Sequence, residues 1–491
     1  MKRWVTVVGV LALAAAAFGY EVVPVAAPES AAASAGHGGG WLDTAADEPC
    51  LTAEQRAAIK VMLADSAAEL RARGLLPAPD ASAAVTGLIW PVRAAAHVHD
   101  PGVHGISNFV DQNAAFPDQL LDYDCGARTY DLTSGYNHQG TDIFTWPFSW
   151  HKMDDDDVEV VAAAPGVILQ KSDGNYDRQC GFGTGNWNAV YVQHADGSVA
   201  WYGHMKNGSL TAKTVGQSVA AGEFLGVVGS SGNSTGPHLH LELYDPAGNL
   251  ADPWAGACNS LNPTSWWLDQ PPYYDSAVNA LRTGSAAPAF QSCPTPAVTG
   301  ESLQFQAGDL VYFTTFYRDQ LQGQVSTYRV LRPDGTLWRE WTGSSNQPHY
   351  AASYWWWSWF LPVDAADGWW TFRVIYQGVA TDHSFAVGQA GPTDAGDQPR
   401  ATRLHAATPN PFNPATEIAF SLERPAHVRL RVHDLRGRVA AVLWDGPADA
   451  GRHAVTWRGR DDLGRRLAGG AYVVRLESDD GAWSRAVTLL E

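Results

Sequence analysis

The stretch GPHLHLEL, residues 236–243, alternates polar and apolar side chains. Successive residues of a β-strand point to opposite faces of a sheet. His238 and His240 therefore share one face of the predicted strand, and the three leucines share the other face, where they can be buried. The pattern predicts a strand that carries two imidazoles above a hydrophobic core.

Two earlier segments contain residues of the same chemical kind. In HQGTD, residues 138–142, a histidine and an aspartate stand four positions apart, and both are zinc ligands in proteins. Gly140 and Thr141 disfavour a helix, so we expect a turn that enters a strand. Between this segment and the first stretch, YGHM at residues 202–205 follows a strand-like run and contributes His204. The three segments together predict a metal or catalytic site.

The composition restricts the class of protein. The chain has 491 residues, of which 45% are hydrophobic and 17% charged, which excludes disorder for most of it. A chain of this length exceeds a single core, so several domains are expected. The net charge of −18 argues against nucleic acid or anionic lipid as a partner. Short β-rich runs separated by glycine-rich turns predict an all-β fold.

The N-terminus predicts export. A short cationic start precedes the apolar run from Trp4 to Phe18, and Ala15-x-Ala17 is typical of a cleavage site, so a secretory signal peptide is expected. No later run is long enough to span a membrane once the signal is removed. Further along, Thr52 and Gln55 form a capping box before apolar residues at helical spacing, which predicts a helix in the leader.

Composition and the spacing of the β-rich runs divide the chain into segments. We predict a signal peptide at 1–20, a leader with one helix at 21–85, a catalytic domain at 86–285, a β-sandwich accessory domain at 286–390, a linker at 391–402 and a last β-rich domain at 403–491.

Five cysteines follow the signal peptide, and an exported chain is expected to form disulfides. Spacing along the chain suggests the pairs Cys125–Cys180 and Cys258–Cys293, although sequence alone does not determine connectivity. Cys50 is then left over. Its thiolate could occupy the open position of a zinc ion and keep a proenzyme latent; Asn108 or Asn113 is the alternative blocking group.

The central region resembles the lysostaphin-type (LytM-like) zinc metallopeptidases over about residues 86–260. The resemblance rests on the order of the segments 90–92, 161–168, 188–194, 202–205, 226–232 and 237–240, in addition to HQGTD. It implies a catalytic domain of antiparallel sheets with an open groove, of the duplicated hybrid motif type.

The resemblance also implies roles for five residues. His138, Asp142 and His240 match the three zinc ligands, and His204 and His238 match two catalytic histidines beside the metal. Three protein ligands leave one coordination position for water. The implied function is a secreted zinc metalloendopeptidase that hydrolyses peptide bonds in peptidoglycan stems or cross-bridges. A broader extracellular protease acting on Gly-rich peptides and a metal-free wall-binding regulator are the alternatives; the regulator is disfavoured because all five residues are present.

Two other features of the catalytic region stay open. The segment between Asp142 and Val161 is longer than the family pattern and contains four consecutive aspartates at 154–157, which fits a solvated loop, a groove-edge loop that shapes substrate choice, or a weak calcium site. His97, His99, His104, His151 and His194 match no ligand position and are expected at the surface or in structural contacts.

The C-terminal regions suggest accessory roles. The run YWWWSWF at 354–360 fits the core of a β-sandwich, with stacking on a glycan as the alternative. The segment PNPFNP at 409–414 and the strands after it resemble FlgD-like immunoglobulin-fold and type IX secretion sorting domains. That resemblance implies the type IX secretion machinery as a partner and a location outside the cell or on the outer-membrane surface of a bacterium. A simple adhesive sandwich domain is the alternative.

Overall fold

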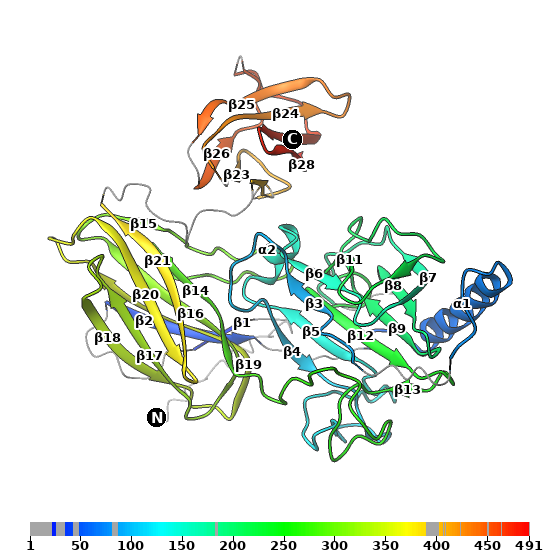
Figure 1. The fold of residues 1–491 in the computed structure, drawn as a ribbon. Coiled ribbons are helices and arrows are strands. Elements are labelled where there is room, and N and C mark those ends of the chain that lie inside the picture. Colours follow the sequence, from blue (N-terminus) through cyan, green and yellow to red (C-terminus); the bar gives the residue numbers. More distant parts are fainter. Residues whose placement is uncertain are drawn as a thin grey trace, which may run out of the picture.

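In the computed structural model the chain is almost entirely β-structure with one long helix in the leader, which confirms the predicted fold class (Figure 1). The structure describes residues 22–25, 35–42, 49–80, 87–181, 185–388 and 402–490, apart from 406, 408, 423, 449–450 and 463. The predicted signal peptide and nearly all of the predicted linker lie outside these residues. Within the described ranges, no helix is both long enough and apolar enough to cross a bilayer.

The central region forms two antiparallel sheets. The larger contains, in spatial order, β10 (Ser218–Val219), β7 (Gly166–Ser172), β8 (Ala189–Gln193), β9 (Val199–Gly203), β12 (His238–Tyr244), β5 (Thr141–Thr145) and β4 (His104–Asn108), with β13 (Leu250–Ala251) beside β12. The smaller contains β11 (Phe224–Val227), β6 (Val158–Val161) and β3 (Val92–Ala94). The strand predicted from GPHLHLEL is therefore β12, and it lies between β9 and β5.

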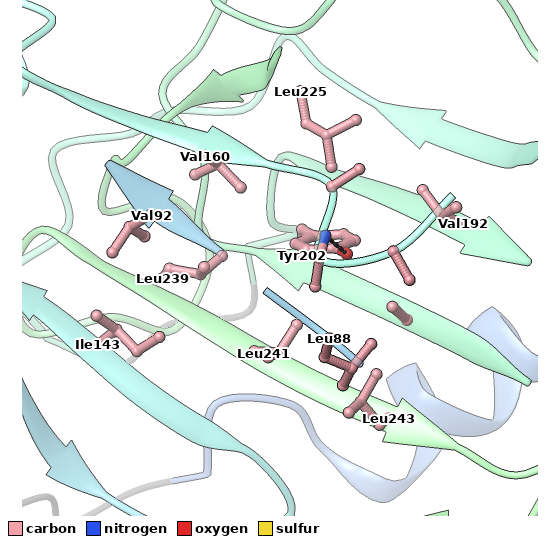
Figure 2. Packing of buried hydrophobic residues seen from close by; sticks show 14 of the residues in the cluster. Leu88, Val92, Ile143, Val160, Val192, Tyr202, Leu225, Leu239, Leu241 and Leu243 are labelled. Atoms are coloured by element: carbon pink, nitrogen blue, oxygen red, sulfur yellow. Dashed lines mark hydrogen bonds between the residues drawn. The ribbon is translucent and has the colours of Figure 1, made fainter. Parts of the chain in front are cut away.

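The apolar face of β12 forms the core between these two sheets. Leu239, Leu241 and Leu243 are buried and pack with Val160 of β6 and Leu225 of β11 (Figure 2). Because side chains alternate along a strand, the even-numbered residues of β12 point to the opposite face of the large sheet.

The leader helix covers that opposite face. Helix α1 (Ala53–Ala72) begins at Thr52, whose side chain accepts from the Gln55 backbone while the Gln55 side chain accepts from Thr52, so the predicted capping box is present. Its buried face packs against the large sheet; the cluster includes Leu63, Ala67 and Leu70 of α1 and Tyr191, Trp201 and Tyr244 of the sheet. The even-numbered face of β12 is thus enclosed by a segment that precedes the domain in sequence.

The next region is a sandwich of two five-stranded sheets. One contains β1 (Val22–Val25), β2 (Gly36–Leu42), β19 (His349–Phe360), β16 (Leu310–Leu321) and β14 (Ala277–Gly284). The other contains β15 (Gln304–Phe305), β21 (Val379–Val387), β20 (Gly368–Tyr376), β17 (Val325–Leu331) and β18 (Leu337–Ser344). The strands β1 and β2, drawn in blue, come from the leader and extend the first sheet (Figure 1).

The tryptophan-rich run supplies the interior of this sandwich. Trp355, Trp357 and Trp359 alternate along β19 and are 4% exposed or less, and Trp370 of β20 is fully buried beside them. Their burial supports the core interpretation of the run, because rings enclosed between two sheets are not available for stacking on a glycan.

The last region is a smaller immunoglobulin-like domain. One sheet contains β22 (Arg403–Leu404), β23 (Thr416–Leu422) and β26 (Gly451–Trp457), and the other contains β25 (Val439–Ala448), β24 (Ala426–Asp434), β27 (Gly470–Ser478) and β28 (Gly481–Leu489). Buried residues from both sheets, including Phe420 and Leu476, form its core.

The segment inserted after Asp142 is not the solvated loop that its charge suggested. It contains the short helix α2 (Ser149–Asp154), and Trp146 and Phe148 pack against Phe290 and Phe316 at the sandwich. Three aspartates of this run are paired with cations: Asp154 with Arg178, Asp156 with Lys206 and Arg485, and Asp157 with Arg403. These pairs also disfavour a calcium site.

The disulfide pairing suggested by spacing was wrong. Cys125 is bonded to Cys258 and Cys180 to Cys293, and Cys50 is free and buried. The prediction paired cysteines that are close in sequence, whereas the two bonds connect cysteines that are 133 and 113 residues apart.

Candidate metal centre

Strand pairing brings the predicted ligands together. In the register of β5 and β12, Asp142 lies directly opposite His240, so the two side chains leave the same face of the sheet. His138 stands in the turn just before β5, and His204 directly follows β9, whose Gly203 is the partner of His240 on the other side. Five residues separated by up to 102 positions therefore meet around one point of β12.

Three ligand atoms converge at this point. His138 Nε2 lies 3.0 Å from Asp142 Oδ2, and His240 Nδ1 lies 2.8 Å from Asp142 Oδ1. All three side chains are at least 97% buried. Two imidazole nitrogens and a carboxylate oxygen at this spacing form a donor set that zinc accepts, so the residues fit the metal that the resemblance implies.

The outer nitrogen of each ligand histidine is occupied. His138 Nδ1 lies 2.7 Å from the Phe109 carbonyl oxygen, and His240 Nε2 lies 3.1 Å from Glu242 Oε2. Because these oxygens accept hydrogen bonds, the protons belong on the outer nitrogens. The inner nitrogens are then left with lone pairs directed at Asp142, as metal ligation requires.

His204 and His238 form a second pair beside the ligands. Their ring centroids are 4.4 Å apart, and their Nδ1 atoms lie 2.6 Å from the Ser231 carbonyl oxygen and 2.8 Å from that of Gly236. Their Nε2 atoms therefore face the centre, and that of His238 is 3.8 Å from Asp142 Oδ1. His204 has φ of 59°, a left-handed conformation that is strained for a residue with a side chain and that is most common at functional sites.

The charges in the centre are strongly coupled. Burial alone raises the pKa of Asp142, but His138 and His240 outweigh it and hold that pKa well below its ordinary value. Burial lowers the pKa of His138, and Asp142 more than reverses this and raises it to about 9. Burial, followed by the neighbouring His238, lowers the pKa of His204 and favours its neutral form.

Gly140 is required by the close approach of His240. A Cβ atom at this position would lie 2.5 Å from His240 Cε1 and 2.8 Å from the Leu241 carbonyl oxygen. Neither contact is sterically possible, so any larger residue must displace the ligand ring or the strand.

Two residues that support the centre were not predicted from the sequence. Glu242, two positions after His240, accepts from His240 Nε2 and is fully buried. Arg56 of α1 donates to Glu242 from Nε at 2.9 Å. The alternation of GPHLHLEL was a signal for Glu242, because it places this carboxylate on the histidine face, whereas nothing in the sequence pointed to Arg56.

The remaining candidates lie elsewhere. His97 contacts Asp157, His151 Nε2 lies 2.8 Å from the Ala297 carbonyl oxygen, and His194 Nδ1 lies 2.9 Å from that of Pro165. Asn113 caps a turn through its bond with the Ala115 amide. Asn108 is an exception, because it lies at the centre and donates to Asp142 Oδ2 at 3.2 Å. By contrast, the Cys50 sulfur lies within 4.8 Å of the ligand atoms of His138, Asp142 and His240.

Comparison with known families agrees with this geometry. Residues 136–253 match the family model described as "Peptidase family M23", and these limits contain all five site residues. The chain contains a peptidase M23 domain. Residues 407–482 match a second family model, "FlgD Ig-like domain".

Individual relatives of the M23 domain are similar over short lengths. A stretch of 83 residues, 17% of this chain, is 43% identical to "DD-carboxypeptidase/endopeptidase Mpg" of Neisseria meningitidis. The protein of the same name from Neisseria gonorrhoeae is similar to the same extent. The chain spans about a sixth of the length of these curated relatives, at 16%.

Two solved structures are also similar. The catalytic domain of the prophage-encoded M23 protein EnpA from Enterococcus faecalis is 26% identical, with 32% of this chain and 93% of that chain covered and a TM-score of 0.20. The catalytic domain of the antimicrobial peptidase lysostaphin from Staphylococcus simulans is 27% identical, with 26% and 83% covered and a TM-score of 0.19.

Proposed function

We propose that this protein is a secreted zinc-dependent metalloendopeptidase that hydrolyses peptide bonds of peptidoglycan stems or cross-bridges. The observation that carries the proposal is the convergence of His138 Nε2, Asp142 Oδ and His240 Nδ1, each histidine with its outer nitrogen already engaged. The location of this cluster inside the M23 match supports it.

Each site residue has a role in this proposal. His138, Asp142 and His240 hold the metal, and Glu242 orients His240. When bound, zinc supplies Lewis-acid polarisation of the scissile carbonyl and makes water acidic enough to attack at neutral pH.

The histidine pair would move protons. His204 and His238 present Nε2 to the centre while their Nδ1 atoms are fixed by backbone carbonyl oxygens. An imidazole can accept the proton of the attacking water and return one to the leaving amine, because the ordinary pKa of this group is near neutrality.

The substrate and the location are inferred from the accessory evidence. The names of the relatives, a carboxypeptidase/endopeptidase and an antimicrobial peptidase, support peptide bonds of the cell wall as the target. Two disulfides favour an oxidising compartment. We propose that the predicted segment boundaries describe the domains, except that β1, β2 and β14 belong to the sandwich. We also propose that the FlgD-like region at 403–491 is a sorting domain recognised by a type IX secretion machine.

The test measures metal and peptide hydrolysis together. The full chain is purified with its disulfides intact, its zinc content is determined, and it is incubated with isolated cell walls before and after limited proteolysis. We expect one zinc per chain and new free amino groups in the walls. The variant His240→Ala should lose both, whereas His97→Ala, a histidine outside the centre, should keep both.

Two other results would redirect the assignment. Zinc-free protein that binds walls without cleaving them would identify a wall-binding regulator. Cleavage of Gly-rich proteins with no release of amino groups from walls would identify a broader extracellular protease.

A further inference from the structure

The free cysteine lies at the centre of the proposed site. The Cys50 side chain is 95% buried, and its sulfur is within 4.8 Å of the ligand atoms of His138, Asp142 and His240. It is also within 4.8 Å of a nitrogen of His204 and of His238. The other four cysteines form two disulfides, so no cysteine of the chain is left to pair with it.

The surroundings of Cys50 differ from those of a structural cysteine. A buried free cysteine usually behaves as a small apolar residue in an apolar environment. Here the sulfur faces imidazole nitrogens and a carboxylate, and its hydrogen-bond contact is the Tyr130 hydroxyl at 3.3 Å. Nε2 of His204 is a buried atom without a hydrogen-bond partner in the described part of the chain.

These atoms also make a consistent set around a cation. The inner nitrogens of His138 and His240 carry lone pairs because their outer nitrogens donate, and Asp142 offers oxygen. A thiolate adds a fourth electron-pair donor of the type that zinc binds most readily. With both imidazoles neutral and the thiol ionised, these four groups would offer four electron pairs to one cation.

We infer that the Cys50 thiolate is a fourth protein ligand of the metal centre, so that the chain with its leader in place is a latent form. This inference rests on the proposed function. A zinc ion with four protein ligands is closed, whereas a catalytic zinc keeps one position for water or substrate. As the thiol binds, its proton passes to solvent, and it is taken up again when the sulfur leaves; no oxidant or reductant takes part.

Contacts of the leader on both sides of Cys50 hold this residue at the centre. Before it, the Pro49 carbonyl oxygen accepts from Asn233 Nδ2 at 3.1 Å. After it, the capping box at Thr52 starts α1 at once, and Arg56 on the first turn anchors the helix to Glu242.

Further contacts extend this attachment. Gln55 Nε2 donates to the Gly185 carbonyl oxygen at 3.2 Å, and Ser66 Oγ donates to that of Leu169 at 2.5 Å. None of these bonds involves the metal ligands, so the sulfur is presented at a high effective concentration. Activation then requires removal of the leader or capture of the thiol.

The test detects the sulfur–metal bond directly. The full chain, with disulfides intact, is titrated with Co²⁺ in place of zinc, and the parent is compared with Cys50→Ser, which preserves size. We expect an intense near-ultraviolet thiolate-to-cobalt absorption in the parent, and only the weaker visible bands of cobalt in Cys50→Ser. The affinity for cobalt should fall by roughly tenfold or more in the variant.

A second measurement requires no variant. Cys50 is the one free thiol of the chain, so alkylation with iodoacetamide, located by peptide mapping, reports its access. We expect zinc to slow alkylation at least about tenfold relative to the chelator-treated protein, because a coordinated sulfur is not a free nucleophile. Uncleaved Cys50→Ser should also release more amino groups from cell walls than the uncleaved parent.

The outcomes separate the two proposals. The role of Cys50 would be overturned if both proteins bind cobalt without the thiolate absorption and zinc does not change the rate of alkylation. That result would not contradict the proposed metallopeptidase function. Equal latency of Cys50→Ser and the parent would overturn the regulatory part. If neither protein binds cobalt or zinc, the proposed function fails, and the role of Cys50 fails with it.

Discussion

Arg56 of the leader helix and Glu242 of the central strand form an ion pair that is almost completely buried, with Nε 2.9 Å from Oε1 and the Arg56 side chain 9% exposed. Glu242 in turn accepts from His240. Glu242 thus orients His240 and also holds the leader helix on the site. Removal of the leader leaves Glu242 bonded to His240 but without its cationic partner.

Loss of Arg56 should release the helix. Arg56→Ala leaves the buried Glu242 carboxylate uncompensated, a change that costs about 3–5 kcal/mol in buried pairs. Opening of α1 restores water to the carboxylate, so we expect cleavage of the leader by an added protease to accelerate roughly a hundredfold. The control is Arg73→Ala, which removes the exposed Arg73–Glu69 pair on the same helix and should change the rate little. Equal rates for the two variants would contradict the anchoring role.

Gly140 should prove necessary for metal affinity rather than for folding. An alanine Cβ would meet His240 Cε1 at 2.5 Å, so the ring must move away from Asp142. We expect Gly140→Ala to bind zinc roughly ten- to a hundredfold more weakly while its circular dichroism stays unchanged. Gly446→Ala in β25, where a Cβ meets no atom within 4 Å and the backbone is not left-handed, tests for a general effect of substitution. Unchanged zinc affinity in Gly140→Ala would show that the backbone of the strand moves and the His240 ring does not.

His204 and His238 should affect turnover without affecting metal content. Neither belongs to the ligand trio, and both are held by backbone carbonyl oxygens beside it. We expect His204→Ala and His238→Ala, activated by removal of the leader, to keep one zinc per chain and to lose about 10²–10⁴-fold in kcat. Loss of zinc in either variant would instead make that histidine a ligand.

Asp100 should make the junction between the M23 domain and the sandwich sensitive to acid. Asp100 is paired with Lys152 of α2 at 3.0 Å and with Arg282 of β14 at 2.7 Å. Burial raises the pKa of Asp100, but Arg282 and Lys152 outweigh it and hold the pKa well below the ordinary value of 3.8. A carboxyl group with a lowered folded-state pKa contributes stability above 3.8 and loses it as the pH falls towards the folded-state pKa.

The corresponding measurement is urea unfolding as a function of pH. We expect Asp100→Asn to lower the free energy of unfolding by about 3–5 kcal/mol at pH 7, because both cations lose their buried partner. The difference from the parent should shrink steadily below about pH 4, the ordinary range of an aspartate. Asp382→Asn, which breaks the exposed Asp382–Arg373 pair, should cost less than about 1 kcal/mol. A difference that does not vary with pH would assign the effect of Asp100→Asn to packing.

Peptide mapping without reduction should recover the pairs Cys125–Cys258 and Cys180–Cys293, with Cys50 as the free thiol. Each bond closes a loop of more than 100 residues, so Cys180→Ser with Cys293→Ser should destabilise the protein by about 4 kcal/mol in the chain-entropy model. Recovery of a Cys125–Cys180 peptide would show that this connectivity is incorrect.

The sequence by itself was sufficient to predict the elements that depend on local patterns. Alternation in GPHLHLEL predicted β12 and its two faces, because the side-chain period of a strand is two residues. The Thr52–Gln55 capping box predicted the start of α1, because capping depends on residues within one turn. The five histidine and aspartate candidates were also identified from sequence order, and the structure places them together.

Only the tertiary structure decided which distant segments meet. The two disulfides, the pairing of Arg56 with Glu242, 186 residues apart, and the position of Cys50 among the ligands all depend on how sheets and helix pack. Contacts of this kind carry no periodicity, because the groups that meet belong to elements whose separation along the chain is unrelated to their separation in space. The sequence therefore predicted the candidate ligands, and packing of the leader against the sheet showed what covers them.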